Sequence, residues 1–193
     1  MDFPWDRVLF SDETTFLLHG KKSKTWYIPP KKKALRTIKH PAKVHVWACF
    51  AQNGFGQIYF FTSNLNSEKM CEIYKKALLP SVAKLFPKNT DWYLQEDNDP
   101  KHGSKLAMDW KMKNEIEVIQ WPSCSPDQNP IENLWQILKM KMSSKQVNTI
   151  KGLKSEIKKA WNQLPKDLAY KLAQSMKKRL KALVDAGGDY TMY

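Results

Sequence analysis

The sequence predicts an α/β protein, with a mixed sheet flanked by helices on both faces. The first sixty residues form short segments of alternating polarity, and the hairpin signal Asn53-Gly54 separates residues 44–50 from residues 56–61. Beyond residue 66, apolar residues recur with a helical period, and short strand-like segments interrupt them. An antiparallel meander followed by a β-α-β unit requires a sheet that is covered on both sides.

In the first half, four strands are expected, together with one small extra strand. Two short strands cover residues 7–12 and 14–19, and the second ends at Gly20. A basic loop at about residues 20–43 follows and carries the small strand at residues 25–28. The hairpin strands at 44–50 and 56–61 complete the meander.

In the second half, helices and strands alternate. Asn66 is a good N-cap for a helix that reaches residue 82, and Asn129-Pro130 opens another after a proline-rich loop at residues 122–130. The other expected elements are strands at 92–95 and 116–120 and helices at 104–113, 149–164 and 166–185. We expect residues 1–143 to form the core and residues 144–193 to form a basic helical tail packed on it.

The charge of the chain indicates a polyanionic partner. The 193 residues include 32 Lys and Arg against 19 Asp and Glu, a net charge of +13. Residues 20–43 carry nine basic residues and no acid, and residues 144–184 carry eleven and two, so the rest of the chain is acidic. This balance favours nucleic acid first and an acidic membrane surface second. The alternative for the tail is that its lysines are simply solvated helix faces.

Several classes of protein are excluded. The sequence has 42% hydrophobic residues, which is enough to bury a core, so global disorder is not expected. No apolar run approaches 18 residues, so no membrane span is predicted, and no signal peptide is visible. Nucleic acid, and not a membrane, is therefore the expected partner. The three cysteines, Cys49, Cys71 and Cys124, are far apart, which argues against a disulfide scaffold and a CxxC-type zinc site.

Three carboxylates stand where predicted elements end or begin: Asp12, Asp97 and Glu132. Carboxylates at the ends of neighbouring strands can converge, and hard oxygen ligands suit Mg²⁺ or Mn²⁺. Two such ions about 4 Å apart would hold the attacking and leaving oxygens of a phosphoryl transfer.

Each carboxylate also has a plain structural explanation. Asp12 and Glu13 could be turn residues, and Asp97 could belong to an Asx-turn before Pro100. Glu132 could be the N3 residue of a capping box with Asn129 as N-cap.

Four stretches resemble the transposases of the Tc/mariner superfamily. Residues 8–14 (VLFSDET), 94–102 (LQEDNDPKH) and 121–135 (WPSCSPDQNPIENLW) resemble its three catalytic motifs, and residues 46–48 (VWA) match the pattern between the first two. Thirty-four residues lie between Asp97 and Glu132, the interval typical of the Tc branch.

The resemblance implies a ribonuclease-H-like fold with an Asp-Asp-Glu metal site formed by Asp12, Asp97 and Glu132. Mg²⁺, for which Mn²⁺ can substitute, would bind there as two ions and activate water, and later a 3′-hydroxyl, against DNA. The predicted protein is therefore the catalytic domain of a cut-and-paste DNA transposase, acting as a homo-oligomer, most simply a dimer, in the nucleus. The alternatives are a domesticated domain that binds DNA or protein without catalysis, and a nuclease without strand transfer.

Contacts to DNA are predicted in the basic loop, from Lys31, Lys32, Lys33 and Arg36, and in the second motif, from His102. For His102 the alternative is a hydrogen bond to the backbone at a helix start. Trp26 is a candidate for base stacking, whereas Trp121 and Trp135 are expected in the core.

The sequence departs from the family pattern in two respects. Gly103 replaces the usual Thr or Ser, with Ser104 available to cap the helix. The family's N-terminal helix-turn-helix modules are not in this sequence, so reading of transposon ends is expected to lie elsewhere.

Overall fold

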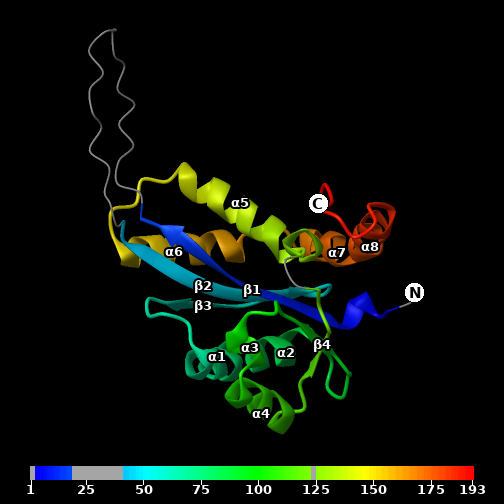
Figure 1. The fold of residues 1–193 in the computed structure, drawn as a ribbon. Coiled ribbons are helices and arrows are strands. Elements are labelled where there is room, and N and C mark those ends of the chain that lie inside the picture. Colours follow the sequence, from blue (N-terminus) through cyan, green and yellow to red (C-terminus); the bar gives the residue numbers. More distant parts are fainter. Residues whose placement is uncertain (1–2, 19–40, 123–124) are drawn as a thin grey trace.

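A five-stranded mixed sheet forms the centre of the molecule. The computed structural model describes residues 3–18, 41–122 and 125–193 (Figure 1). The strands are β1 (Val8–Leu17), β2 (Lys43–Ala51), β3 (Gly54–Phe61), β4 (Tyr93–Gln95) and β5 (Glu117–Val118), in the order β3-β2-β1-β4-β5. β1, β2 and β3 are antiparallel, whereas β4 and β5 run parallel to β1. The predicted combination of a meander with a β-α-β unit is confirmed.

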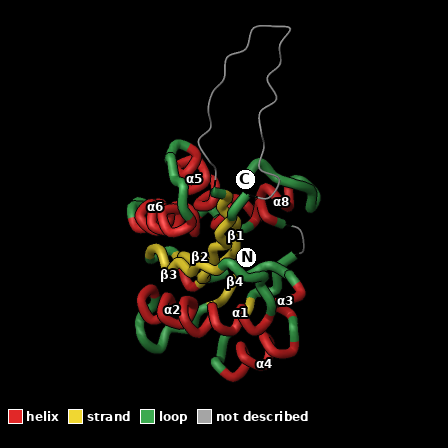
Figure 2. The backbone as a smooth tube through the Cα atoms, turned by 90° about the vertical axis from the view of Figure 1, so that its left-hand side faces the viewer, coloured by secondary structure: helices red, strands yellow, loops and turns green. Residues whose placement is uncertain are grey.

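Helices cover both faces of this sheet, as predicted. One layer holds α1 (Ser67–Ile73), the π-helical turn η2 (Tyr74–Leu78), α2 (Leu79–Leu85), α3 (Pro100–Gly103) and α4 (Lys105–Lys113). The other holds α5 (Ile131–Ser143), α6 (Ile150–Asn162), α7 (Lys166–Gln174) and α8 (Met176–Asp185). Figure 2 shows the strands between the two layers. Short 3₁₀ turns, η1 (Trp5–Arg7) and η3 (Pro126–Gln128), precede β1 and α5.

The alternation of side chains along the strands divides the interior into two cores. Leu9 and Trp47 point toward the layer of α1 and α2, whereas Phe10 and Val46 point toward α5, α6 and α7. Trp161 of α6 is 2% exposed and packs in the second core, so the helices after residue 143 share their core with the sheet. The predicted boundary at residue 143 stays a prediction.

Five predicted elements differ from the structure. The two strands expected at residues 7–12 and 14–19 are one continuous strand, because residues 10–17 pair with β2 without a break. The strand at 116–120 is reduced to β5, and the helix at 166–185 is divided at Ser175 into α7 and α8. In the helix after Asn66, the π-helical turn η2 precedes Pro80, which has no N–H to continue the α-helical pattern.

The remaining expectations concern residues that the structure does not describe, the cysteines and membrane spans. The small strand at residues 25–28, Trp26 and Cys124 lie outside the described residues. Cys49 and Cys71 are both free thiols. Among the helices that the structure describes, none has the length and apolar character needed to cross a bilayer.

Candidate catalytic site

The register of the sheet brings Asp12 and Asp97 side by side. β1 and β4 are parallel, and their last pair joins Phe10 to Gln95. Asp12 and Asp97 each lie two residues beyond that pair, just past the point where β1 and β4 separate, and both line the same cavity. The sequence suggested that Asp12 lies at the end of a strand. In the structure it lies within β1, which continues to Leu17 beside β2 after its pairing with β4 has stopped.

Helix α5 brings the third carboxylate to the same place. Trp135 lies one turn after Glu132, and its indole N–H donates to Asp12 Oδ2 at 3.0 Å. Just before the helix, the side-chain amide of Asn129 donates to the backbone oxygen of Ser11 at 3.3 Å. These two bonds fix the start of α5 against β1, so Glu132 faces Asp12.

The three carboxylates line one cavity of about 140 Å³. Its other lining residues include Gln95, Asn98, Trp121, Pro122, Ser125, Pro126 and Asn129, so it lies between the end of β4 and the third motif. The structure therefore brings together all three predicted metal ligands. Glu13 and Glu96 do not line this cavity.

The capping-box alternative for Glu132 is wrong. Pro130 occupies the N-cap position of α5, and Asn129 Oδ1 accepts from the Ile131 N–H at 3.3 Å. Glu132 is thus one position too early to be the N3 residue. No donor among the described residues makes a hydrogen bond to its carboxylate, and Glu132 lines the cavity.

Neither Asp12 nor Glu132 forms an ion pair with a basic side chain among the described residues. Burial, together with the charges of Glu13 and Glu132, raises the pKa of Asp12 to about 8. Burial also raises the pKa of Glu132, against a small opposing effect of Lys139. Both groups therefore favour a proton or a bound cation over exposure of their charge to one another.

Asp97 lies in the opposite environment. His102 Nε2 is 3.2 Å from Asp97 Oδ1, and this hydrogen bond lowers the pKa of Asp97 to about 2 although part of the carboxylate is buried. The Asp97 side chain is 53% exposed, so it remains open to the cavity while one oxygen is held.

His102 is the centre of a buried cluster of charges. Its Nδ1 lies 2.9 Å from the Tyr74 hydroxyl and 3.2 Å from Glu96 Oε2, and its Nε2 lies 3.6 Å from Glu13 Oε1. Burial alone would lower the pKa of His102, but the carboxylates of Asp97, Glu13 and Glu96 beside its ring outweigh burial and raise the pKa to about 11. His102 is therefore an imidazolium at neutral pH.

The structure bears on the two sequence interpretations of His102 differently, and the predicted DNA contact stays a prediction. Its side chain is only 5% exposed and its ring faces carboxylates, so the prediction that it contacts DNA gains no support. It also does not act as a backbone-bonding residue at a helix start. Lys111 forms an ion pair with Glu96 and donates to the backbone oxygen of His102 at 3.1 Å, which completes the cluster.

Gly103 causes no local defect. The side chain of Ser104 accepts from the Ala107 N–H at 3.2 Å and caps α4, as expected from the sequence. Asp99 caps the preceding turn α3 by accepting from the Lys101 N–H. A Cβ at position 103 would meet open space, so neither packing nor capping requires a Thr or Ser there.

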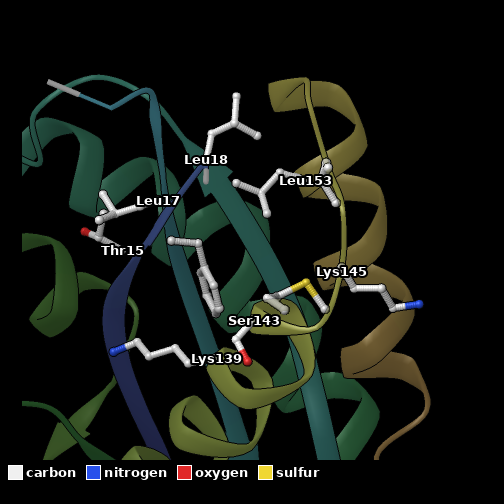
Figure 3. Close-up of a pocket in the computed structure, with 10 residues that line it drawn as sticks. Thr15, Leu17, Leu18, Lys139, Ser143, Lys145 and Leu153 are labelled. Atoms are coloured by element: carbon white, nitrogen blue, oxygen red, sulfur yellow. The ribbon is translucent and has the colours of Figure 1, made fainter. Parts of the chain in front are cut away.

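A second cavity, of about 260 Å³, lies toward the opposite end of α5 (Figure 3). Apolar side chains such as Leu17, Leu18 and Leu153 line it, and Lys139 and Lys145 stand at its sides with their amino groups directed outward. It contains none of the three carboxylates.

The donor set suits a hard divalent cation. Three carboxylates converge on one cavity, and the raised pKa of Asp12 reflects burial first and then repulsion by Glu13 and Glu132, which a bound cation would offset. Within the described residues, however, no three His, Cys, Asp or Glu side chains are close enough to enclose a metal ion as they stand. Binding would therefore draw the three side chains together.

A family model described as DDE superfamily endonuclease matches residues 7–154. The chain belongs to this family. It is 30% identical to the Tc1 transposase of Caenorhabditis elegans, over 98% of this chain and 71% of that protein. The Tc3 transposase of the same organism is also 30% identical, over 98% of this chain and 59% of its own length. The chain is thus a Tc/mariner transposase catalytic domain, as its motifs predicted.

Solved structures agree on the fold. The Mos1 mariner paired-end complex with Mn superposes with a TM-score of 0.84 at 16% identity, covering 97% of this chain and 57% of that one. The isolated catalytic domain of Mos1 transposase gives a TM-score of 0.78 at 14% identity, covering 97% of this chain and 85% of that one. The predicted ribonuclease-H-like fold is confirmed.

Sequence reasoning missed several residues of the site. Trp135 was expected only in the core, although its i+3 spacing from Glu132 already placed both on one helix face. The buried contacts of Glu96 and Lys111 had no sequence signal, because they depend on how α4 packs beside β4. Lys31, Lys32, Lys33 and Arg36 lie outside the described residues, so their predicted DNA contacts stay predictions.

Proposed function

We propose that this chain catalyses divalent-metal-dependent hydrolysis of DNA phosphodiester bonds and the subsequent strand transfer of a cut-and-paste transposase. The convergence of Asp12, Asp97 and Glu132 on one cavity carries the proposal. Solved Mos1 paired-end complexes with Mn and with Mg support the choice of metal. No observation favours the alternative of a non-catalytic domain.

Each residue of the site has a distinct task in this proposal. Asp12, Asp97 and Glu132 would hold two Mg²⁺ ions, for which Mn²⁺ can substitute. The ions supply Lewis acidity to the scissile phosphate and to the attacking hydroxyl. His102 keeps Asp97 ionised and fixes one of its oxygens, and Trp135 orients Asp12. The protein thus supplies one ligand, Asp97, that is already ionised, whereas Asp12 would release its proton when the metal binds.

Lys139 would contact the DNA phosphate backbone where it leaves the three carboxylates. It lies seven residues after Glu132 on α5, which places it on the same helix face about 10 Å along the axis. It is exposed, and it lowers the pKa of Glu132 at a distance. Exposed lysines on α6 and α8 extend the positive surface on this layer: Lys151, Lys158, Lys159 and Lys181.

The proposed oligomeric state rests on analogy with the Mos1 complexes, and the proposed location rests on the substrate. Mos1 has been solved as paired-end complexes and as a strand transfer complex. By analogy, this domain would work as a dimer that holds two transposon ends. Its substrate would be chromosomal DNA, which requires access to the nucleus.

The metal assignment is tested by thermal unfolding with Mn²⁺. Wild-type protein should gain melting temperature as Mn²⁺ is added, because the ion binds only the folded site. Asp97→Asn should lose most of this gain, since it removes a ligand charge. The matched control is Asp99→Asn, two residues away, which retains the helix cap. An equal Mn²⁺ response in Asp97→Asn and wild type would refute the assignment.

The chemistry is tested on DNA that carries a pre-nicked end with a free 3′-hydroxyl. With Mn²⁺, wild type and Asp99→Asn should both produce nicked or strand-transfer products. Glu132→Gln should produce none, because the carboxylate that faces Asp12 is neutralised. Equal product from Glu132→Gln would remove Glu132 from the site.

A further inference from the structure

The start of α5 is held by a residue far along the chain. Arg179 of α8 is 2% exposed, and one guanidinium nitrogen donates to the backbone oxygen of Asp127 at 2.5 Å. The other terminal nitrogen donates to Asn133 Oδ1, also at 2.5 Å. One of these acceptors lies in η3 before Glu132, and the other directly follows Glu132. Figure 1 shows α8 beside the beginning of α5.

The guanidinium is used here for its shape. Its Nε donates to Ser175 Oγ at 2.9 Å, so all three of its nitrogens are engaged by neutral acceptors. Among the described residues, no carboxylate comes within ion-pair distance of it. Burying a charge without an ion pair is costly, and an apolar side chain would fill the same space. The planar fork, however, fixes two separate backbone segments at once.

The last residues of the chain hold the same loop from outside. The backbone N–H and the hydroxyl of Thr191 donate to Asp127 Oδ2 at 3.2 and 2.7 Å. The ring of Tyr193 lies 4.8 Å from the Arg179 guanidinium carbon. Asp127 is thus held at its backbone oxygen by Arg179 and at its carboxylate by Thr191.

Glu132 needs such external support. No described residue donates a hydrogen bond to its carboxylate, so its position depends entirely on where η3 and the first turn of α5 lie. Each of the two segments contains a residue bonded to Arg179. A shift of α5 by one ångström would move Glu132 away from Asp12 and Asp97 by the same amount, which is enough to weaken a metal site.

We propose that Arg179 is a positioning residue for Glu132: it braces the third-motif turn and the start of α5 so that the three carboxylates can close on one metal ion. Thr191 secures the same turn through Asp127. The proposal rests on the proposed metal-dependent function, and it gives the C-terminal helix a role in the active site that it does not itself touch.

The first test compares Mn²⁺ affinity by calorimetry in Arg179→Gln and Lys178→Gln. Both remove one positive charge from α8, but Lys178 is exposed. Arg179→Gln should weaken Mn²⁺ binding about tenfold or more, the usual effect of losing a residue that supports a metal ligand. Lys178→Gln should bind as wild type does. Arg179→Lys, which can reach one acceptor but not both, should fall between them.

A double-mutant cycle separates positioning from simple stability. If Arg179 acts through Asn133, the effects of Arg179→Gln and Asn133→Leu on Mn²⁺ affinity should be less than additive when combined. A merely structural role would lower the melting temperature of both variants without metal and leave their Mn²⁺ affinity unchanged. That result would overturn the proposal.

A measurement without metal tests the positioning role of Arg179 independently of the proposed function. The indole N–H of Trp135 donates to Asp12, so its NMR resonance reports how α5 sits on β1. This resonance should shift in Arg179→Gln and stay unchanged in Lys178→Gln. If wild type fails to bind Mn²⁺, the proposed function is wrong, whereas an unshifted Trp135 resonance in Arg179→Gln rejects the brace itself.

Discussion

Asp12 on β1 and Asp97 in the loop after β4 each lie two residues beyond the last pair that joins these two strands, yet their surroundings are opposite. Asp97 borders the α1–α4 layer, where His102 lowers its pKa to about 2. Asp12 points toward the α5–α7 layer, where burial and two other carboxylates raise its pKa to about 8. Asp97 is thus kept ionised by an internal cation, whereas Asp12 is left without one.

This difference shows how a fold can prepare a metal site without closing it. The Asp97 side is neutralised by buried cations and needs no ligand to be stable. The Asp12 side, with Glu132, carries repulsion that only a proton or an external cation relieves. Binding of metal and folding stability are therefore coupled mainly through Asp12 and Glu132.

The largest effect is expected from removal of the internal cation. His102→Gln leaves Glu13, Glu96 and Asp97 without their shared positive charge, and we expect a loss of about 3–5 kcal/mol in unfolding free energy. Urea unfolding at pH 7 measures it. Lys101→Gln is the control, since Lys101 pairs with Glu13 and Asp99 at the rim and should cost less. Equal losses would mean that the cluster has no central cation.

The next largest effect concerns the donor to Asp12. Trp135→Phe removes the indole hydrogen bond, and a loss of about 1.5–3 kcal/mol is expected once Asp12 is ionised. The loss should be larger at pH 9 than at pH 6, because the bond to a carboxylate is stronger than the bond to a carboxylic acid. Trp161→Phe loses a comparable bond, to the backbone oxygen of Gly56, and should show no such pH dependence. A pH-independent loss in Trp135→Phe would contradict the high pKa of Asp12.

The pH dependence of metal-free stability follows from the same group. Folded Asp12 holds its proton up to about pH 8, whereas the unfolded chain releases it near the ordinary value of 3.8. The stability contributed by the protonated form is therefore complete below pH 3.8 and lost as the pH rises through 8. Asp12→Asn cannot ionise, so it should exceed wild type by about 1–2 kcal/mol at pH 8, after allowance for screening by solvent. Mn²⁺ should restore the stability of wild type only. If Asp12→Asn is no more stable than wild type at pH 8, Asp12 does not have the raised pKa that distinguishes it from Asp97.

The smallest effect is expected from the cation on α5. Lys139→Gln should change stability by no more than about 0.5 kcal/mol, because the side chain is exposed. It should nevertheless weaken DNA binding and reduce the slope of log affinity against log salt by about 1. Fluorescence anisotropy with random duplexes measures both. Lys113→Gln, on the opposite layer, is the control. An equal loss of DNA affinity in this variant would contradict the proposal that DNA binds on the layer of α5.

The sequence predicted most elements of the fold because their signals are local. Asn53-Gly54 marked the hairpin between β2 and β3, Asn66 marked the start of α1, and Ser104 marked the cap of α4. The break predicted after Asp12 failed because β2 pairs continuously across it, which is a contact between distant segments. The helix predicted at 166–185 failed at Ser175 for a similar reason, since the chain turns there to place Arg179 under α5.

The three carboxylates were nameable from the sequence because their motifs are contiguous and their order is fixed. Composition likewise determined the basic character that favours DNA. Their charge states were decided only in three dimensions, because a pKa depends on burial and on neighbours that no local pattern specifies. His102 reaches Asp97 from the next turn of chain, Trp135 reaches Asp12 from 123 residues away, and Arg179 braces Glu132 from another helix. The sequence determined which groups could do the chemistry. The packing of two layers on one sheet decided that Asp97 is held ionised by an internal cation and that Asp12 and Glu132 are not.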